Sequence, residues 1–226
     1  MSELSNKERV LKIAAALEEL NTKVVYVGGS VVQFYASDQG AASPMTTYDV
    51  DCVVDLTTYR EYHTFEEELH DKNFSNDTSE GAPICRFLFD EEKVDFMPKV
   101  DTGIGESNRW YPMGVEHKQS FPINPKTTIY IMPVTYYLAS KFEALHSRGG
   151  SDYRGSKDFE DIVFVVNNCH DLKEEIERSN DDEVKGYLKS EFSILCQRPN
   201  FWEEIECALD DDDRVDVVAK RMNSIT

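Results

Sequence analysis

The sequence predicts an α+β fold in which a small sheet with its helices is followed by an all-helical C-terminal region. Residues 1–132 contain short runs rich in β-branched and aromatic residues, which are typical of strands, between helical patterns. From Pro133 onward, the apolar residues recur at helical spacing. This order favours a mixed domain over residues 1–132 and a helical domain over residues 133–226.

The first 132 residues predict alternating helices and strands. Helices are predicted at 3–20, from Ser30 onward, and at 58–72. Strands are predicted at 22–27, 48–56, 84–89, 93–97 and 128–132. The acidic turn 90–92 joins two of these strands into a hairpin. Residues 99–127 hold Gly, Pro and Asn with little periodicity, so we expect an irregular segment there, either a domain boundary or the rim of a site.

The C-terminal part predicts a succession of helices. They are expected at 133–147, 156–168, 171–178, 181–196, 200–208 and 213–223. The acidic run Asp210-Asp211-Asp212-Asp213 precedes the last of them, and carboxylates favour the N-terminal turn of a helix. We therefore interpret this run as a solvated helix start.

Charge excludes one broad class of function. The chain has 24 Lys and Arg against 43 Asp and Glu, a formal net charge of −19. Such a surface repels polyanions, so we expect no extended nucleic-acid surface, although a local basic pocket stays compatible with the sequence.

Cysteine usage and hydropathy indicate the compartment. The five cysteines are widely spaced and contain no C-x-x-C pair, which argues against a disulfide framework and a structural zinc site. No apolar run approaches the ~20 residues that span a bilayer. We therefore expect a cytoplasmic protein with no membrane partner.

The first motif is Gly28-Gly29-Ser30, where a predicted strand runs into a helix. Glycines let the backbone approach a ligand closely, and the free amides of a helix N-terminus suit a phosphate group. Paired glycines before a helix are, however, most often only a tight turn.

The second motif consists of acidic residues on strands. Asp49 and Asp51 alternate with Val50, so both carboxylates project from one side of their strand. Two like charges so close favour a cation between them, and carboxylate oxygens are ligands that Mg²⁺ prefers. Asp95 adds a third carboxylate on a later strand. The alternative is an edge strand with a solvated polar face.

Together, these motifs resemble the polymerase-beta-like nucleotidyltransferase superfamily over residues 24–97. Its pattern is a strand, a Gly-Gly-Ser turn and a helix, then a D-x-D strand and a single Asp on a later strand. Residues 137–144 (YLASKFEA), Arg148 and residues 157–162 (KDFEDI) are similar to the AbiEii-type bacterial nucleotidyltransferases, whose members include toxins of toxin–antitoxin systems.

The resemblance implies a nucleotidyltransferase fold with a small mixed sheet flanked by helices. It implies transfer of a nucleoside monophosphate from an NTP to an acceptor hydroxyl of a tRNA, a protein or a small molecule. Asp49, Asp51 and Asp95 would be the catalytic residues and would bind Mg²⁺ or Mn²⁺. Asp49 and Asp51 would bind both of two metal ions, and Asp95 would complete the second metal site. An antitoxin protein is an implied partner.

Nucleotide-binding roles are implied for Gly28, Gly29, Ser30, Thr47, Lys141 and Asp158. Gly29 and Ser30 would contact the triphosphate, and Lys141 would face its phosphates. Met45 stands where many relatives have an arginine, and the loop 37–46 is longer than usual. These departures concern the phosphate contacts and the acceptor, not the acidic triad.

Alternatives stay open for the second half and for the function. Lys141 and Arg148 lie seven residues apart on one helix face and fit a solvent-exposed position equally well. Asp158 and Asp161 could pair with Lys157 or Arg154. Rival functions are a nucleotide-binding or partner-binding module without turnover, and an aminoglycoside-type nucleotidyltransferase, because an acidic pocket suits a cationic acceptor.

Overall fold

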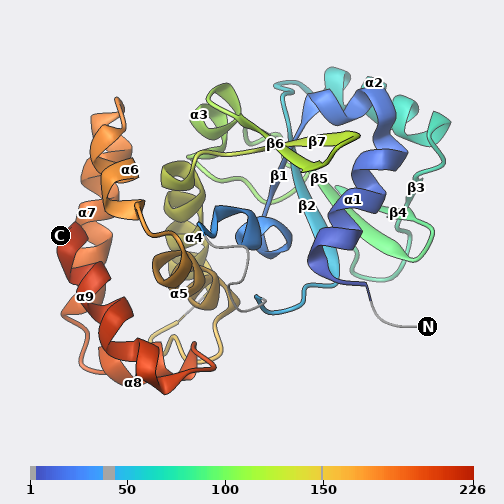
Figure 1. Cartoon of the computed structure of the whole chain (residues 1–226). Coiled ribbons are helices and arrows are strands. Elements are labelled where there is room, and N and C mark those ends of the chain that lie inside the picture. Colours follow the sequence, from blue (N-terminus) through green and yellow to red (C-terminus); the bar gives the residue numbers. More distant parts are fainter. Residues whose placement is uncertain (1–3, 38–43, 149) are drawn as a thin grey trace. The chain divides into compact units, whose positions relative to one another are not determined.

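The computed structural model describes residues 4–37, 44–148 and 150–226 (Figure 1). The chain divides into two compact units. Unit 1 consists of Met1–Val31 and Thr46–Pro133, and unit 2 of Val32–Met45 and Val134–Thr226. The sequence predicted a single boundary after residue 132, which assigns residues 32–45 to the first domain. In the structure these residues belong to unit 2.

In the described residues, unit 1 contains a seven-stranded mixed sheet with the order β3-β4-β5-β2-β1-β7-β6. The strands are β1 Val24–Val27, β2 Asp49–Val54, β3 Ser75–Asn76, β4 Arg86–Phe89, β5 Glu92–Pro98, β6 Gln119–Asn124 and β7 Thr127–Ile131. β2 pairs with β5 in parallel, as β1 does with β7, and the other neighbours are antiparallel. The predicted hairpin at 84–97 is β4–β5.

Each of the two long helices of unit 1 begins with a capping box. The helical elements of this unit are α1 Asn6–Leu17, η1 Glu18–Lys23, α2 Tyr59–Asp71 and α3 Tyr111–Glu116. Ser5 and Glu8 form a capping box at the start of α1, and Thr58 and Glu61 form one at α2. Each box satisfies backbone amides that have no partner within the helix.

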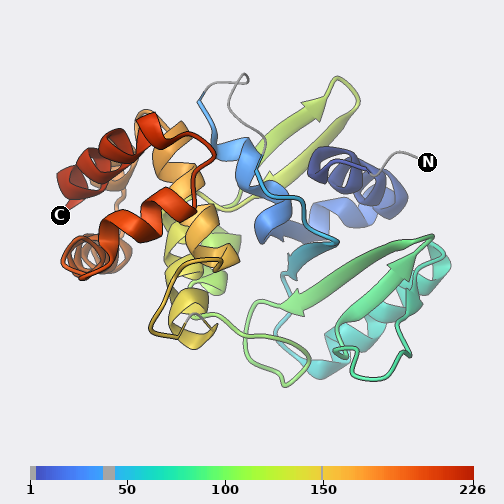
Figure 2. The ribbon, with the colours of Figure 1, turned by 90° about the horizontal axis from the view of Figure 1, so that it is seen from below.

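α1 and α2 cover the same face of the sheet. Arg9 of α1 forms a buried ion pair with Glu92, and Phe65 of α2 packs edge-on against Phe96 with ring centroids 5.5 Å apart. Side chains alternate along a strand, so Glu92 and Phe96 of β5 point to one face and Asp95 to the other. Figure 2 shows α1 beside the hairpin β6–β7 and α2 beside β4–β5. The carboxylates therefore lie on the face opposite α1 and α2.

The segment 99–127 is more regular than the sequence predicts. It contains α3 and the edge strand β6. Pro112 stands at the start of α3, and Pro122 lies in β6 next to a register shift. Proline lacks a backbone donor but is tolerated in both places, so the prolines that predicted irregular structure are compatible with these elements. The helix predicted from Ser30 is instead the 3-10 element η2 Gly29–Tyr35, in which the chain leaves unit 1.

Unit 2 is helical beyond residue 133, as predicted. Its helices are α4 Val134–Arg148, α5 Lys157–Asn168, α6 Leu172–Arg178, α7 Asp182–Cys196, α8 Phe201–Cys207, η3 Asp212–Arg214 and α9 Val215–Ile225. Phe142 of α4 and Phe192 of α7 meet edge to face at 5.2 Å in its core. The acidic run lies at the start of η3, where Asp211 caps the amide of Asp213.

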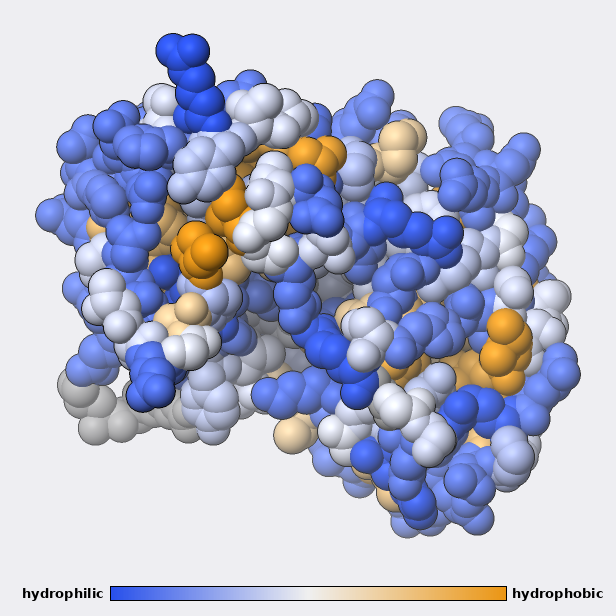
Figure 3. Space-filling model, turned by 180° about the vertical axis from the view of Figure 1, so that it is seen from behind, coloured by the Kyte–Doolittle hydropathy of each residue, from blue (hydrophilic) through white to orange (hydrophobic). Residues whose placement is uncertain are grey.

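The hydrophilic character of the surface is consistent with the high content of charged residues. The face shown in Figure 3 is mainly hydrophilic, with hydrophobic residues only in small separate patches. None of the helices in the described part of the chain combines the length and the apolar composition that a membrane crossing requires.

A buried ion pair fixes the loop before α5. Glu204 of α8 is fully buried and accepts hydrogen bonds from Arg198 at 2.6 and 2.8 Å and from the Tyr153 amide at 3.2 Å. The Arg198 guanidinium also lies 3.6 Å from the centroid of the Tyr153 ring. Arg198 lowers the pKa of Glu204, so the carboxylate is ionised when folded.

Glu204→Gln should lower the free energy of unfolding by about 2–3 kcal/mol, because it leaves the Arg198 charge half-buried without its anion. The exposed neighbour Glu203 on the same helix provides the control, and Glu203→Gln should stay within ~0.5 kcal/mol of the unmodified chain. Urea unfolding followed by circular dichroism measures both. Equal losses in the two variants would contradict the assignment.

Candidate functional site

The parallel register of β2 and β5 brings three carboxylates together. Asp51 lies opposite Asp95, and Asp49 lies two residues earlier on the same face of β2. One oxygen of each carboxylate lies within 4.8 Å of those of the other two. Asp95 is buried, while Asp49 and Asp51 are half-buried. Among the described residues this is the group of acidic side chains that could hold a metal ion.

Arg86 of β4 neutralises part of this charge. In the antiparallel hairpin, Arg86 stands opposite Asp95. Its Nε donates to Asp95 Oδ1 and its Nη2 to Asp95 Oδ2, both at 2.7 Å, and Nη2 lies 3.4 Å from Asp49 Oδ2. The hydrogen bond to Asp95 raises the pKa of the Arg86 guanidinium, so it stays charged.

Sequence reasoning missed Arg86, although the signal was present. The predicted three-residue turn 90–92 pairs residue 89 with 93 and would place 86 opposite 96. In the structure Glu92 belongs to β5, so residue 89 pairs with 92 and 86 with 95. The predicted hairpin therefore brought the arginine close to the third carboxylate, but one residue out of register.

The glycine turn touches the acidic group directly. Gly28 has a φ of +69°, a conformation that L side chains rarely adopt. A Cβ at this position would overlap with the Asp51 carboxylate and lie only 2.8 Å from its Cγ. Gly28 is therefore required both by the backbone conformation and by the close approach of Asp51.

Two other predicted residues of unit 1 support the neighbouring backbone. The residue Ser30 is 1% exposed, and its Oγ donates to the Val27 carbonyl at 3.4 Å. Thr47 Oγ1 donates to the Asp49 carbonyl at 2.8 Å, where β2 begins. Gly29 follows Gly28 and opens η2. The nucleotide-binding roles of Gly29, Ser30 and Thr47 stay predictions.

Lys141 and Asp158 lie in unit 2 and belong to a charge network between α4 and α5. Lys141 Nζ lies 2.6 Å from Asp161 Oδ2 and 3.2 Å from Asp158 Oδ1. Arg148 Nη2 lies 3.0 Å from Asp158 Oδ2. The sequence also suggested that Asp158 or Asp161 could pair with Arg154. Arg154 instead pairs with Asp152 at 2.6 Å. Lys141 is 8% exposed, so the alternative of a solvent-exposed lysine is wrong.

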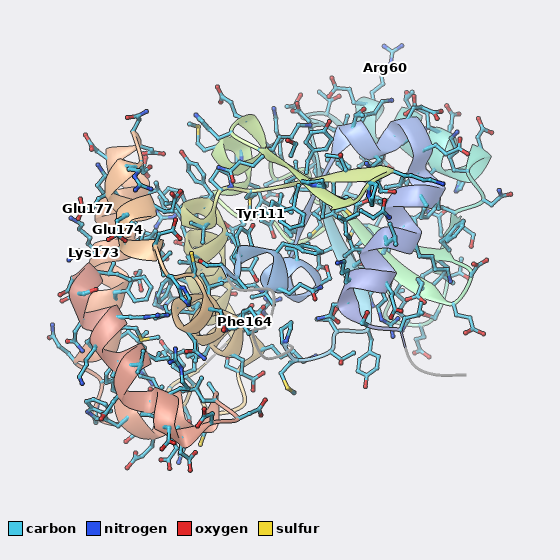
Figure 4. All side chains as sticks on the ribbon, in the orientation of Figure 1. Arg60, Tyr111, Phe164, Lys173, Glu174 and Glu177 are labelled. Carbon is cyan, nitrogen blue, oxygen red and sulfur yellow. The ribbon has the colours of Figure 1, made fainter. Side chains whose placement is uncertain are left out.

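A small acidic cavity lies in unit 2. It has a volume of about 140 Å³, and Phe164 of α5, labelled in Figure 4, is one of its walls. Its acidic lining consists of Glu160, Asp161, Asp210 and Asp211. Burial raises the pKa of Glu160, and the neighbouring charge of Asp161 adds to this shift. Met45, which is largely exposed, also lines the cavity.

The cysteines are all free thiols, as the sequence predicts. All five lie in the described part of the chain, and Cys52, Cys85 and Cys169 are buried. Burial, helped by the charge of Asp95, raises the pKa of Cys85 to about 12. This thiol beside the acidic group is therefore protonated at neutral pH and is no candidate nucleophile.

Solved structures share this architecture. An antigenic nucleotidyltransferase-like protein from Paracoccidioides brasiliensis matches with a TM-score of 0.50 and 17% sequence identity, over 92% of this chain and 95% of that chain. The antibiotic-resistance factor ANT(2'')-Ia matches with a TM-score of 0.51 and 14% identity, over 84% of this chain and 94% of that chain.

No protein-family model matches the chain, and no curated protein matches it by sequence. At the identities of the two structures, the similarity concerns the fold. The predicted fold class is confirmed: the chain has an α+β nucleotidyltransferase fold with a mixed sheet, flanking helices and a helical C-terminal region. Membership in the AbiEii-type family stays a prediction.

Proposed function

We propose that the chain is a metal-dependent nucleotidyltransferase, which transfers a nucleoside monophosphate from an NTP to an acceptor hydroxyl and releases pyrophosphate. The observation that carries this proposal is the acidic triad Asp49, Asp51 and Asp95. One oxygen of each carboxylate lies within 4.8 Å of those of the other two, in a nucleotidyltransferase fold. Gly28 against Asp51 adds the glycine turn to the same site.

The chemistry of the triad suits Mg²⁺ or Mn²⁺. The donors are hard carboxylate oxygens, and three anions are only partly neutralised by Arg86. A bound divalent ion would neutralise charge on the triphosphate and on the attacking and leaving oxygens. Asp49 and Asp51 would hold it on the half-buried side of β2. Asp95, oriented by Arg86, would help to activate the acceptor hydroxyl.

The backbone of the glycine turn would accept the phosphates. The resemblance places Gly28 and Gly29 at the turn that meets the triphosphate, and backbone amides at such a turn attract phosphate oxygens. We keep Ser30, Thr47, Lys141 and Asp158 as predicted nucleotide-binding residues. For Ser30 and Thr47, support of the glycine turn and of the start of β2 is the role that their hydrogen bonds favour.

The acceptor stays open among a tRNA, a protein side chain and a small molecule. The net charge of −19 weighs against a large RNA surface. A toxin role with an antitoxin partner, as in AbiEii-type proteins, is part of the proposal and depends on the resemblance of residues 137–162.

A cationic small molecule is the second candidate acceptor, because one observation favours it. The cavity of unit 2 is lined by Glu160, Asp210 and Asp211, besides Asp161, which pairs with Lys141, and carboxylates suit the amino groups of an aminoglycoside. The solved structure of an antibiotic-resistance factor with this fold is consistent with such an acceptor. Aminoglycoside susceptibility of a strain that expresses the chain tests this candidate directly, and unchanged susceptibility would remove it.

Asp51→Asn should reduce transfer by roughly 100-fold or more, since it removes a charged ligand from the site while keeping its size. Each labelled NTP is incubated with the protein, Mg²⁺ and total cell extract, and the label in acceptors and the release of pyrophosphate are measured. Asp55→Asn is the matched control, because Asp55 follows β2 but is exposed and pairs with Lys99 at 2.5 Å. It should keep full activity.

The same experiment separates transfer from simple binding. If no acceptor is labelled, no pyrophosphate is released and NTP binds without Mg²⁺ in calorimetric titration, the chain is a nucleotide-binding module instead of an enzyme.

Gly28→Ala should abolish NTP binding and transfer, because its Cβ would push the Asp51 carboxylate out of the triad. We also expect a loss of about 1–3 kcal/mol of folding stability from the positive φ. Gly81→Ala shares the positive φ (+82°) but has no atom within 4 Å of the added Cβ. It should lose similar stability and keep NTP binding. Binding is measured by calorimetry, and equal effects of both variants on binding would contradict the role of Gly28.

A further inference from the structure

The Arg86 guanidinium holds both oxygens of one member of the triad. Its Nε and Nη2 donate to Asp95 Oδ1 and Oδ2, both at 2.7 Å. Asp49 Oδ2 lies farther away, at 3.4 Å. A planar guanidinium that pairs with a carboxylate through two parallel hydrogen bonds forms a strong, geometrically specific ion pair. Asp95 is therefore engaged by a cation of the chain itself, more tightly than Asp49 is.

The formal charge of the triad and Arg86 limits the number of divalent ions that the site binds tightly. The three ionised carboxylates and the Arg86 guanidinium together carry a formal charge of −2. One divalent ion compensates this charge completely. A second divalent ion would make the site positive, and it would have to approach the guanidinium itself.

Burial opposes any rearrangement that would release Asp95. The side chains of Asp95 and Arg86 are 11% and 20% exposed, whereas that of Asp49 is 38% exposed. Separating a buried ion pair leaves two poorly solvated charges, which is strongly unfavourable. The antiparallel pairing of β4 with β5 also holds the backbones of Arg86 and Asp95 opposite each other. Arg86 therefore engages Asp95 more closely than it does the other two carboxylates, Asp49 and Asp51, which remain the better ligands for an incoming ion.

We propose that Arg86 takes the place of a second divalent cation at Asp95, so that the site binds one divalent ion tightly, against Asp49 and Asp51. Arg86 is thus a positioning residue: it orients the Asp95 carboxylate and sets the number of ions bound. This inference deepens the proposed function and rests on its metal-binding triad.

The test counts Mn²⁺ ions bound to the full-length protein without NTP or acceptor. Free Mn²⁺ is measured by electron paramagnetic resonance during titration, and calorimetry gives the affinities. We expect one tightly bound ion for the unmodified chain. In Arg86→Met, a second ion should bind at least roughly tenfold more tightly than in the unmodified chain, because a competing charge is removed. Two ions of similar affinity, or none, in the unmodified chain would overturn the proposal.

Two further variants keep the test decisive. Arg60 is an exposed arginine on α2 whose side chain points away from the fold in Figure 4, so Arg60→Met should bind Mn²⁺ like the unmodified chain. Arg86→Lys keeps the charge but cannot hold both oxygens in a fork, so its second ion should bind with intermediate affinity. If Arg86→Met does not fold, Arg86→Lys carries the comparison. Unchanged binding in a folded Arg86 variant would contradict the role of Arg86.

A thermal readout is independent of ion counting. Without metal, Arg86→Met should have a lower melting temperature than Arg60→Met, because three carboxylates then repel one another, and added Mn²⁺ should restore more of the loss. The outcomes also separate the two proposals. One tight Mn²⁺ without any nucleotide transfer contradicts only the proposed function, whereas two equal ions with transfer contradict only the inference about Arg86.

Discussion

The candidate site depends on the parallel register between β2 and β5. That register sets Asp51 opposite Asp95 and leaves Cys52 and Phe96 on the face that α1 and α2 cover. A shift by one residue would turn Asp95 toward the apolar core and expose Phe96. Phe96 is fully buried, and its ring meets that of Phe65 on α2. The aromatic packing of one face thus fixes the position of the carboxylates on the other.

Two residues next to β2 and β5, Arg86 and Gly28, complete this arrangement. Arg86 supplies positive charge from β4, and Gly28 supplies space from the end of β1. Without the arginine, the carboxylates would repel one another, and with any side chain at residue 28, Asp51 would be displaced. The acidic group is therefore enclosed by one residue that neutralises it and one that makes room for it. Both come from the strands that flank β2 and β5 in the sheet.

The sequence predicted the parts of the site that follow from local spacing. The alternation of Asp49 and Asp51 with apolar residues, and the strand that contains Asp95, are local patterns. That the three carboxylates lie close together depends on the register of two strands that are far apart in the sequence. Local patterns do not reveal this register, so the prediction came from the resemblance alone. The predicted hairpin brought Arg86 close to Asp95, but the exact pair depended on Glu92 belonging to the strand and not to the turn. Sequence could not reveal that Lys141 is buried between two carboxylates, because this depends on how α4 packs on α5.

Charge balance also distinguishes the triad from the ionic network of unit 2. In that network, Lys141 and Arg148 face Asp158 and Asp161, so two cations match two anions. These four side chains have no net formal charge, whereas the triad and Arg86 together have a formal charge of −2. Moving Lys141 to a nucleotide phosphate would leave Asp161 buried without its closest cation, which costs several kcal/mol. A phosphate role for Lys141 therefore requires that nucleotide binding supply this energy. Arg148, whose side chain is 52% exposed, could reorient at lower cost.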